Sequence, residues 1–171
     1  KVTNQTSIKC VELLETGQVD LIVINYPNSY LSNLYSFKQI AEFKDVFIAN
    51  RSFAELKDKT LSFRDLLNYP ILMLDRKSTT SEFLHSLFQK HQLDLVPEIE
   101  LSSNDLLIDL AKIGLGIAFI PDYCVPKNSD DLFVVHTDEV LPTRQLVVVH
   151  NDHVPVSKAT LEFLNYFQSI E

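Results

Sequence analysis

Three short segments rich in hydroxyl and amide side chains each stand directly before a predicted helix. They read NQTS (Asn4–Ser7), STTS (Ser78–Ser81) and SSND (Ser102–Asp105). One such residue is enough to cap the first turn of a helix, and capping alone is the structural alternative for each cluster. The remaining polar groups, together with the free N–H groups and positive dipole end of a helix N-terminus, could hold a ligand. The clusters therefore predict a site for a small anion or polar metabolite.

The sequence shows no combination of reactive residues that would indicate catalysis. The sequence contains no G-x-S-x-G motif, no glycine-rich phosphate loop and no C-x-x-C pair. His150 and His153 are three residues apart, which on a strand places them on opposite faces. His85 and His91 are expected at the surface, and Asp20 is expected in a turn before a strand. We therefore expect no catalytic residue, no cofactor and no metal, and hence no enzyme.

Alternating helices and strands must position the three clusters. Periodicity and capping residues predict helices over 7–16, 62–68, 81–91, 105–113 and 157–167. Short apolar runs predict strands over 20–24, 45–50, 71–74, 98–101, 117–120, 132–137 and 145–149. This alternation indicates an α/β fold with largely parallel sheets. In such folds the loops at the carboxyl ends of the strands line the ligand site, so we expect the clusters to converge.

Glycine is scarce, and most of it lies in one place. The chain has only Gly17, Gly114 and Gly116, whereas about twelve would be usual at this length. The tripeptide Gly114-Leu115-Gly116 separates a predicted helix from a predicted strand. So tight a connection needs a residue at positive φ after the helix and a bare backbone where helix and strand pack. We interpret these glycines as structural.

Composition narrows the class of protein further. The 171 residues carry a net charge of −8, with 15 basic and 23 acidic side chains, so the chain is poorly suited to bind duplex DNA itself. No apolar run approaches the roughly 20 residues of a membrane span, and we expect no signal peptide. Cys10 and Cys124 lie in apolar surroundings, which favours buried free thiols over a disulfide and fits a reducing cytoplasm.

Four segments, in order along the chain, resemble the effector-binding domain of LysR-type transcriptional regulators. They are LLETGQVDLIVI, DLLNYPILML, NDLLIDLAKIGLGIAFIPDYCV and RQLVVVHNDHVPVSKATLEFLNYF. The run G-L-G-I-A-x-I-P within the third segment is the most specific of these motifs.

The resemblance implies a fold like the type 2 periplasmic binding proteins, with two Rossmann-like lobes joined by two crossing strands. The first lobe would comprise residues 1–45 with 150–171, and the second residues 46–149. DVFIAN and RQLVVV would be the crossing strands. The first lobe would be truncated at its N-terminus, because the first strand and long helix of the family, and its winged helix-turn-helix, have no counterpart in the sequence.

The resemblance also implies which residues bind the ligand. An effector would lie in the cleft between the lobes. The positions that match ligand-contacting positions of the family, with their immediate neighbours, are Thr6, Ser7, Ser78, Thr79, Thr80, Ser102 and Ser103. Ile120 and Pro121 would form part of the cleft wall.

The implied function is ligand sensing in a bacterial, cytoplasmic LysR-type regulator. The partner of the domain would be a small polar or anionic metabolite, and the protein would contact DNA only through the missing helix-turn-helix. The resemblance implies no membrane association and a homodimer or homotetramer of the full-length protein, with the oligomeric state of this segment left open. The alternatives are a solute-binding protein of a transporter with the same fold and, third, an enzyme on that fold.

Overall fold

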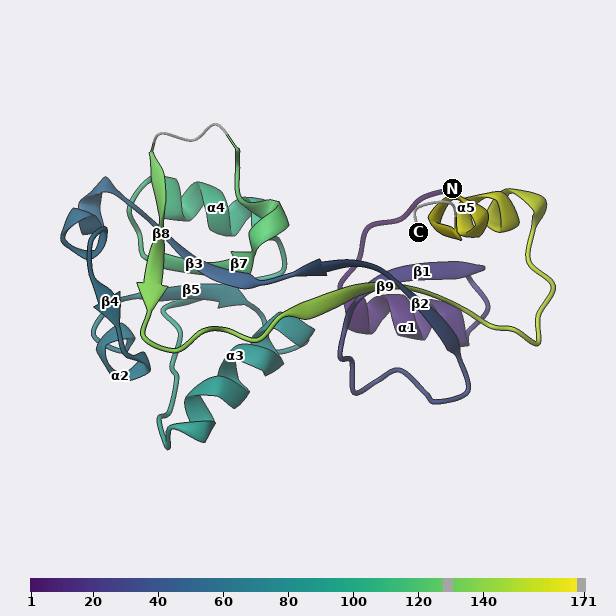
Figure 1. Cartoon of the computed structure of the whole chain (residues 1–171), viewed down its shortest axis with the longest axis horizontal. Coiled ribbons are helices and arrows are strands. Elements are labelled where there is room, and N and C mark those ends of the chain that lie inside the picture. The colour runs from purple at the N-terminus through teal and green to yellow at the C-terminus, as the bar shows by residue number, and fades with distance from the viewer. Residues whose placement is uncertain (128–130, 169–171) are drawn as a thin grey trace. The chain divides into compact units, whose positions relative to one another are not determined.

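The computed structural model describes residues 1–127 and 131–168, and the chain divides into two units (Figure 1). Unit 1 comprises Lys1–Glu42 and Arg144–Glu171, and unit 2 comprises Phe43–Thr143. The chain therefore passes from one unit to the other twice, after residue 42 and after residue 143. The predicted lobes also include residues 128–130 and 169–171, which lie outside the described residues.

Unit 1 is built on a three-stranded sheet. Its elements are α1 (Ser7–Glu15), β1 (Leu21–Tyr26), β2 (Ser36–Phe43), β9 (Arg144–His150) and α5 (Lys158–Gln168), and its strand order is β1-β9-β2. β1 and β9 are antiparallel along their length, from Leu21 opposite His150 to Tyr26 opposite Gln145. α1 packs Val11 and Leu14 on one sheet face, and α5 lies on the other side of that sheet (Figure 1).

Unit 2 is built on a six-stranded mixed sheet in the order β4-β8-β3-β7-β5-β6. Its strands are β3 (Asp45–Asn50), β4 (Thr60–Leu61), β5 (Ile71–Leu74), β6 (Ile99–Leu101), β7 (Ile117–Pro121) and β8 (Leu132–Thr137). Its helices are η1 (Arg51–Leu56), α2 (Phe63–Leu66), α3 (Thr79–Lys90), α4 (Asn104–Lys112) and η2 (Asp122–Cys124).

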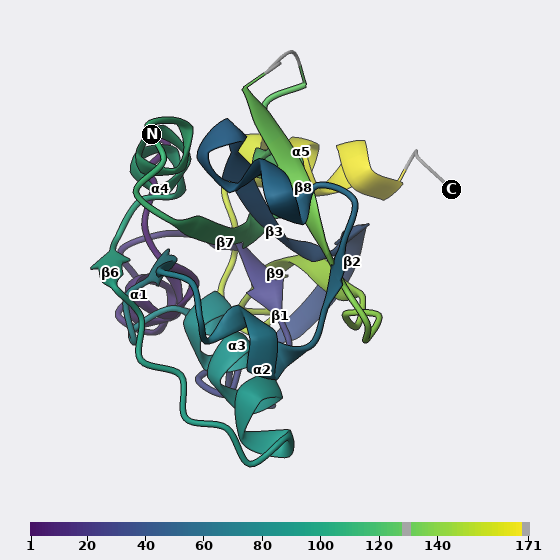
Figure 2. The ribbon, with the colours of Figure 1, turned by 90° about the vertical axis from the view of Figure 1, so that its left-hand side faces the viewer.

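The central strands of unit 2 are buried on both faces, as their continuous apolar runs predict. On β7, Ile117 and Phe119 face the core shared with α2 and α3, whereas Ala118 and Ile120 face the core shared with α4. Figure 2 shows α3 and α4 on opposite sides of this sheet. Successive residues of one strand therefore supply two separate cores.

The predicted helices and strands are present, but the prediction of largely parallel sheets is wrong in part. β5 is parallel to β6 and β7, as helix crossovers require. β3, however, is antiparallel to both β7 and β8, and β1 is antiparallel to β9. The reason is that β3 and β9 each follow a passage from the other unit, so no helix crossover fixes their direction.

The two units begin and end at different residues from the predicted lobes. Residues 144–149 belong to unit 1, because β9 pairs with β1. Residues 43–45 belong to unit 2, where Phe43 meets the ring of Tyr123 edge-on at 5.2 Å and Asp45 pairs with Pro121. The predicted crossing strands DVFIAN and RQLVVV are β3 and β9, and each begins directly after a passage between the units.

Three helices end in the same hydrogen-bonded motif, in which the residue after the cap adopts positive φ. Gly17 (φ +67°) ends α1 and Gly114 (φ +81°) ends α4, which confirms their predicted roles. After α4, Gly114 N–H donates to the carbonyl of Ala111 and Leu115 N–H to that of Leu110. After α3 the same position is occupied by Gln92, at φ 57°.

Gln92→Gly is expected to raise the free energy of unfolding by about 0.5–1 kcal/mol, because glycine adopts this conformation without the steric cost that glutamine bears. Urea denaturation followed by circular dichroism measures the change. Gln89→Gly is the matched control, since Gln89 is exposed inside α3 and the same substitution there should lower stability by about 1 kcal/mol. A loss of stability in both variants would contradict the role assigned to Gln92.

Both cysteines are free, as predicted, although each is half-buried rather than fully buried. Burial raises the pKa of Cys10. Burial, with the nearby carboxylates Asp105, Asp45 and Asp122, raises the pKa of Cys124 to about 11. Thiolate, the reactive form, is therefore scarce at Cys124 near neutral pH.

We expect iodoacetamide at pH ~8 to alkylate Cys124 about a hundredfold more slowly than an unperturbed thiol, because the thiolate fraction falls tenfold for each pKa unit. Mass spectrometry of peptides from a time course gives the rate for each cysteine. The rate should still be rising at pH ~10, where an unperturbed thiol has levelled off. Alkylation of Cys124 as fast as that of an unstructured cysteine peptide would contradict the expectation.

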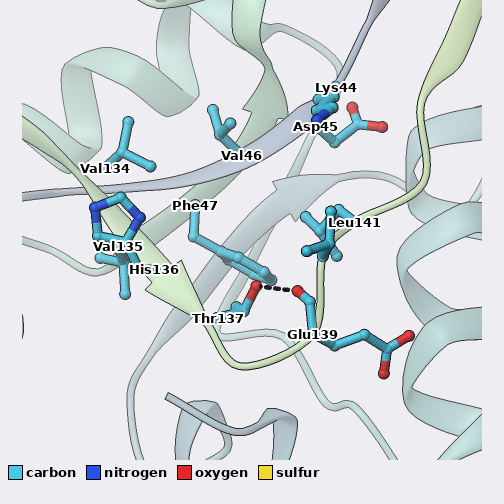
Figure 3. Close-up of a pocket in the computed structure, with 11 residues that line it drawn as sticks. Lys44, Asp45, Val46, Phe47, Val134, Val135, His136, Thr137, Glu139 and Leu141 are labelled. Carbon is cyan, nitrogen blue, oxygen red and sulfur yellow. Dashed lines mark hydrogen bonds between the residues drawn. The ribbon is translucent and has the colours of Figure 1, made fainter. Parts of the chain in front are cut away.

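A cavity of about 220 Å³ lies within unit 2, next to β3 and β8 (Figure 3). It is lined by Lys44, Asp45, Val46, Phe47, Val134, Val135, His136, Thr137, Glu139, Val140 and Leu141. None of the seven predicted ligand-binding residues is among them.

Across the described residues, every helix is too short or too polar to span a bilayer.

Candidate functional site

Parallel pairing in unit 2 brings two of the three hydroxyl-rich clusters to one edge of the sheet. β5 and β6 are paired from Leu72 opposite Ile99 to Leu74 opposite Leu101, and Asp75 N–H donates to the carbonyl of Leu101 at 2.8 Å. The segments that follow these strands lead directly into α3 and α4. β7 is also parallel to β5, so its end at Pro121 lies at the same edge.

The STTS cluster forms the beginning of α3 and is buried. Ser78 is the N-cap, and its hydroxyl accepts a hydrogen bond from Ser81 N–H at 3.1 Å. The preceding turn is held by Asp75, whose carboxylate accepts from Lys77 N–H at 3.0 Å. Ser78, Thr79 and Thr80 are at most 5% exposed. Capping uses one of these hydroxyls, as predicted, and α3 presents its positive dipole end at this place.

The SSND cluster forms the corresponding beginning of α4. Ser103 is the N-cap, and its hydroxyl accepts from Leu106 N–H at 3.5 Å. Ser102, directly before it, is exposed and follows the last residue of β6. The predicted residues Ser102 and Ser103 therefore lie beside the loop that leads into α3, because β5 and β6 are neighbours in the sheet.

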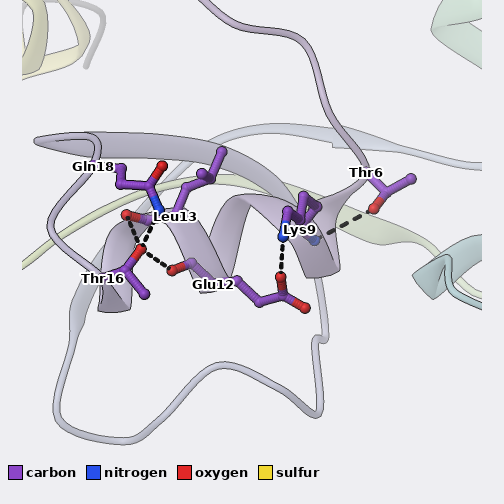
Figure 4. Close-up of polar contacts among 6 residues, drawn as sticks. All are labelled: Thr6, Lys9, Glu12, Leu13, Thr16 and Gln18. Carbon is purple, nitrogen blue, oxygen red and sulfur yellow. Dashed lines mark hydrogen bonds and ion pairs between the residues drawn. The ribbon is translucent and has the colours of Figure 1, made fainter.

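The NQTS cluster belongs to unit 1. Thr6 is the N-cap of α1, and its hydroxyl accepts from Lys9 N–H at 3.3 Å (Figure 4). Ser7 is half-buried, and its hydroxyl accepts from Asn25 N–H at 3.1 Å near the carboxyl end of β1. The far end of α1 is closed by Thr16, whose hydroxyl donates to the carbonyl of Glu12 at 2.8 Å.

Seven predicted residues thus fall into two groups. Ser78, Thr79, Thr80, Ser102 and Ser103 share one sheet edge of unit 2, and Thr6 and Ser7 lie at the start of α1 in unit 1. Each cluster supplies one cap, namely Thr6, Ser78 and Ser103. The other four predicted residues therefore do not cap a helix. They are Ser7, Thr79, Thr80 and Ser102.

Two polar groups that the sequence reasoning left out lie beside the predicted ones. The Ser81 hydroxyl and the Asn104 side-chain carbonyl are buried and have no hydrogen-bond partner within the described residues. Buried polar atoms normally have partners, so such groups mark places where a water or ligand belongs. Both residues stand inside the clusters STTS and SSND, but sequence alone could not show which cluster members are left unpaired.

Few charged side chains lie near this edge of unit 2, and one basic residue, Arg76, is paired with a carboxylate. Arg76 is 76% exposed and lies 3.8 Å from the carboxylate of Glu100. The first turns of α3 and α4 contain Glu82 and Asp105. The geometry therefore offers hydroxyls and helix N–H groups rather than a cationic pocket.

The remaining candidates from the sequence have structural partners. His150 Nε2 lies 3.0 Å from Asp152, whose other oxygen accepts from the Ser36 hydroxyl. No cluster of metal-ligating side chains occurs in the described parts of the chain. Asp20 accepts from the Thr160 hydroxyl at 3.1 Å.

The two histidines expected at the surface differ in exposure. His85 is half-buried, with its Nε2 atom buried and without a hydrogen-bond partner among the described residues. His85 follows Ser81 by one turn of α3, whereas the exposed His91 pairs with Glu139 at 2.7 Å. The partial burial of His85 follows from its helix position, because residues spaced four apart share a face and Ser81 is buried.

Comparison with known proteins identifies the family. The model of the family described as LysR substrate binding domain matches residues 1–170. The chain belongs to this family. A curated LysR-type relative, the HTH-type transcriptional activator CmpR of Synechocystis sp. (strain ATCC 27184 / PCC 6803 / Kazusa), is 29% identical over 158 residues. That alignment covers 91% of this chain but 51% of CmpR, so the chain spans about half the length of this relative.

Solved structures share the LysR-domain fold. The Synechocystis PCC6803 CcmR regulatory domain in complex with 2-PG matches with a TM-score of 0.83 at 22% identity, covering 99% of this chain and 81% of that one. The effector-binding domain of QuiR in complex with shikimate matches with a TM-score of 0.81 at 14% identity, covering 95% and 76%. At these identities the likeness establishes the fold, which is the one predicted.

Proposed function

We propose that this LysR-family domain is the ligand-sensing part of a transcriptional regulator and that it binds a small polar or anionic metabolite. The observation that carries the proposal is the pairing of β5 with β6, which sets two hydroxyl-rich helix N-termini at one edge of unit 2. Family membership favours this function over the solute-binding protein of a transporter. The seven candidate residues are all hydroxyl side chains, with no carboxylate, histidine or cysteine among them, so we propose that the domain binds its ligand without transforming it.

The ligand-binding residues of this proposal are the seven predicted ones, and Ser81 and Asn104 are added to them. Hydroxyl side chains can both donate and accept hydrogen bonds, and helix N–H groups favour a partial or full negative charge. A metabolite that carries hydroxyl groups with one carboxylate or phosphate suits this set. A metabolite that leaves a buried hydroxyl of the protein without a hydrogen-bond partner binds more weakly, and this cost selects among such metabolites.

Sensing requires that the ligand bind two conformations of the protein with different affinity. In the full-length protein, we propose, this difference is transmitted to an N-terminal helix-turn-helix in a cytoplasmic homodimer or homotetramer. Support comes from the name and length of CmpR, of which this chain covers 51%. DNA binding of the full-length protein, measured with and without ligand, tests this part.

The binding site is tested on the 171-residue chain. A thermal-shift screen of 2-PG, shikimate and other small carboxylates and phosphates identifies binders, and calorimetry measures their affinity. Thr79→Val and Ser102→Ala should each weaken binding about three- to tenfold, the effect of one lost hydrogen bond. Ser86→Ala is the control, because Ser86 is exposed about two turns into α3 and its hydroxyl donates to the carbonyl of Phe83. Thr6→Val and Ser7→Ala test unit 1 separately.

Unchanged affinity in both Thr79→Val and Ser102→Ala, for a ligand that binds the wild-type chain, would exclude the unit 2 edge as the site. Unchanged affinity in the Thr6 and Ser7 variants would remove only those two residues from the proposal.

A further inference from the structure

The loop between β1 and β2 carries no charge. It belongs to residues 21–37, the longest run of the sequence without Asp, Glu, Lys or Arg, although 22% of all residues are charged. The next longest runs, 66–74 and 113–121, lead into the buried strands β5 and β7. Residues 27–35 instead form a loop on the α1 side of the unit 1 sheet (Figure 1). Surface loops hold charged side chains readily, so a loop of this length without any is unusual.

Two consecutive turns with the same pattern of hydrogen bonds hold this loop. Asn28 accepts from Tyr30 N–H with its side-chain oxygen at 3.0 Å, and its carbonyl closes the first turn at 3.2 Å. Ser32 accepts from Leu34 N–H with its hydroxyl at 3.3 Å, and its carbonyl closes the second turn at 3.3 Å. The loop therefore keeps its shape through its own side chains and backbone.

The two turns divide the apolar side chains into anchored and exposed ones. The last residue of each turn, Leu31 in the first and Tyr35 in the second, packs against the core beneath α1. The residue before it is exposed, Tyr30 by 50% and Leu34 by 78%. Phe37, the second residue of β2, is 45% exposed. We call Tyr30, Leu34 and Phe37 the loop patch.

The composition of this patch is typical of a protein–protein contact. Interface centres are depleted in charged residues and enriched in aromatic ones. Loops of Tyr, Ser and Asn combine rigid contact area with adaptable hydrogen bonding, and residues 27–35 contain two of each. The ring of Phe37 also lies 4.7 Å from that of Tyr26. Because the loop is already held in place, burying it against a partner has a small entropic cost.

We propose that the loop patch binds the loop patch of a second copy of this chain. The chain has a net charge of −8, so two copies repel wherever their charged surfaces face each other. Contact through the charge-free loops keeps the carboxylates of the two copies apart. In a two-fold arrangement the same patch serves both copies, so the exposed Leu34 and Phe37 side chains of each copy meet apolar groups of the other.

The contact is small, because three side chains of each copy form its centre. Interfaces below about 1,200 Å² are weak, and we expect a dissociation constant of about 10–100 µM. In a full-length homodimer or homotetramer, other surfaces raise the effective concentration to the millimolar range, where so weak a contact is closed. That last step rests on the proposed function, whereas association of the 171-residue chain does not.

Sedimentation velocity of the 171-residue chain, from about 5 to 500 µM, measures this association. Leu34→Glu should weaken it at least about tenfold, because one carboxylate from each copy would enter an apolar contact. Val96→Glu is the matched control, since Val96 is also 78% exposed but lies in unit 2. It adds the same charge away from the patch and should change the dissociation constant by less than about twofold. Circular dichroism checks that both exposed substitutions leave the fold intact.

Salt and a substitution of opposite charge separate this contact from an electrostatic one. Raising the NaCl concentration from about 0.05 to 0.5 M should leave association unchanged or strengthen it up to about threefold, because screening weakens the repulsion between two acidic chains. Leu34→Lys should weaken association although it reduces the net charge, because the contact excludes charges of either sign.

The proposal is overturned if the chain stays monomeric over the whole concentration range, a result that would leave a different protein as the occupant of the loop. It is also overturned if Leu34→Glu and Val96→Glu have equal effects, or if association weakens with salt. Concentration-dependent shifts of ¹⁵N-labelled amides should centre on residues 28–37, and shifts confined to other segments would place the contact elsewhere. None of these outcomes affects ligand binding at the hydroxyl-rich edge, which the calorimetric variants test separately.

Discussion

Gly116→Ala is expected to lower the free energy of unfolding by about 2–4 kcal/mol, a large effect for the addition of one methyl group. A Cβ atom at this position would lie 2.5 Å from the carbonyl oxygen of Pro70 and 2.9 Å from Cδ2 of Leu72. The Pro70 oxygen cannot move aside easily, because it accepts a hydrogen bond from Ile117 N–H at 2.8 Å, where β7 begins beside β5. The backbone of β7 must therefore shift at the centre of the unit 2 sheet.

Urea denaturation of the purified chain measures this loss. Gly17→Ala is the matched control, because Gly17 has a positive φ but no atom within 4 Å of a Cβ, so its cost is the conformational one of about 1 kcal/mol. Combining Gly116→Ala with Leu72→Ala separates the two contacts. If the Pro70 carbonyl decides the effect, removal of the Leu72 side chain gives no rescue. A Gly116→Ala chain as stable as Gly17→Ala would refute the close-packing role of this glycine.

The glycine tripeptide shows how far sequence reasoning reached. Scarcity of glycine and the position of Gly114-Leu115-Gly116 between a helix and a strand predicted one residue at positive φ and one at a close backbone approach. Gly114 is at φ +81° and Gly116 faces Pro70 and Leu72. Both requirements are local or arise between neighbouring elements, which is why spacing alone revealed them. Gln92 was missed, because glutamine at a positive φ leaves no signal in composition.

The pattern of apolar residues in the sequence could not predict the direction of the strands. An apolar run such as DVFIAN indicates burial on both faces, and β3 is buried on both faces. The same run is compatible with parallel or antiparallel neighbours, and direction depends on where the preceding segment comes from. β3 and β9 follow passages between the units and run antiparallel to their neighbours, so the predicted proportion of parallel pairs was too high.

The candidate site was partly accessible from sequence. Hydroxyl clusters before helices predicted the caps Thr6, Ser78 and Ser103, because capping chemistry is local. Which hydroxyls are buried and unpaired, as that of Ser81 is, depends on packing around α3 that no local pattern encodes. The pairing of Arg76 with Glu100 likewise depends on the adjacency of β5 and β6.

The second large effect concerns the aromatic centre of unit 2. Phe119 is fully buried on β7, opposite Phe47 of β3, and its ring centroid lies 4.7 Å from that of Phe47 and 6.4 Å from that of Phe83 on α3. Phe119→Ala removes the ring on which both neighbours pack. The expected loss is about 3–5 kcal/mol, the sum of lost burial and of the void that remains.

Calorimetric and urea unfolding of Phe119→Ala give the loss directly, and Phe119→Leu should recover more than half of it because most of the volume is restored. Phe37→Ala is the control, since Phe37 is 45% exposed on β2 and contacts chiefly the ring of Tyr26 at 4.7 Å, so its loss should stay near 1 kcal/mol. A loss in Phe119→Ala no larger than that in Phe37→Ala would contradict the role assigned to the Phe119 ring.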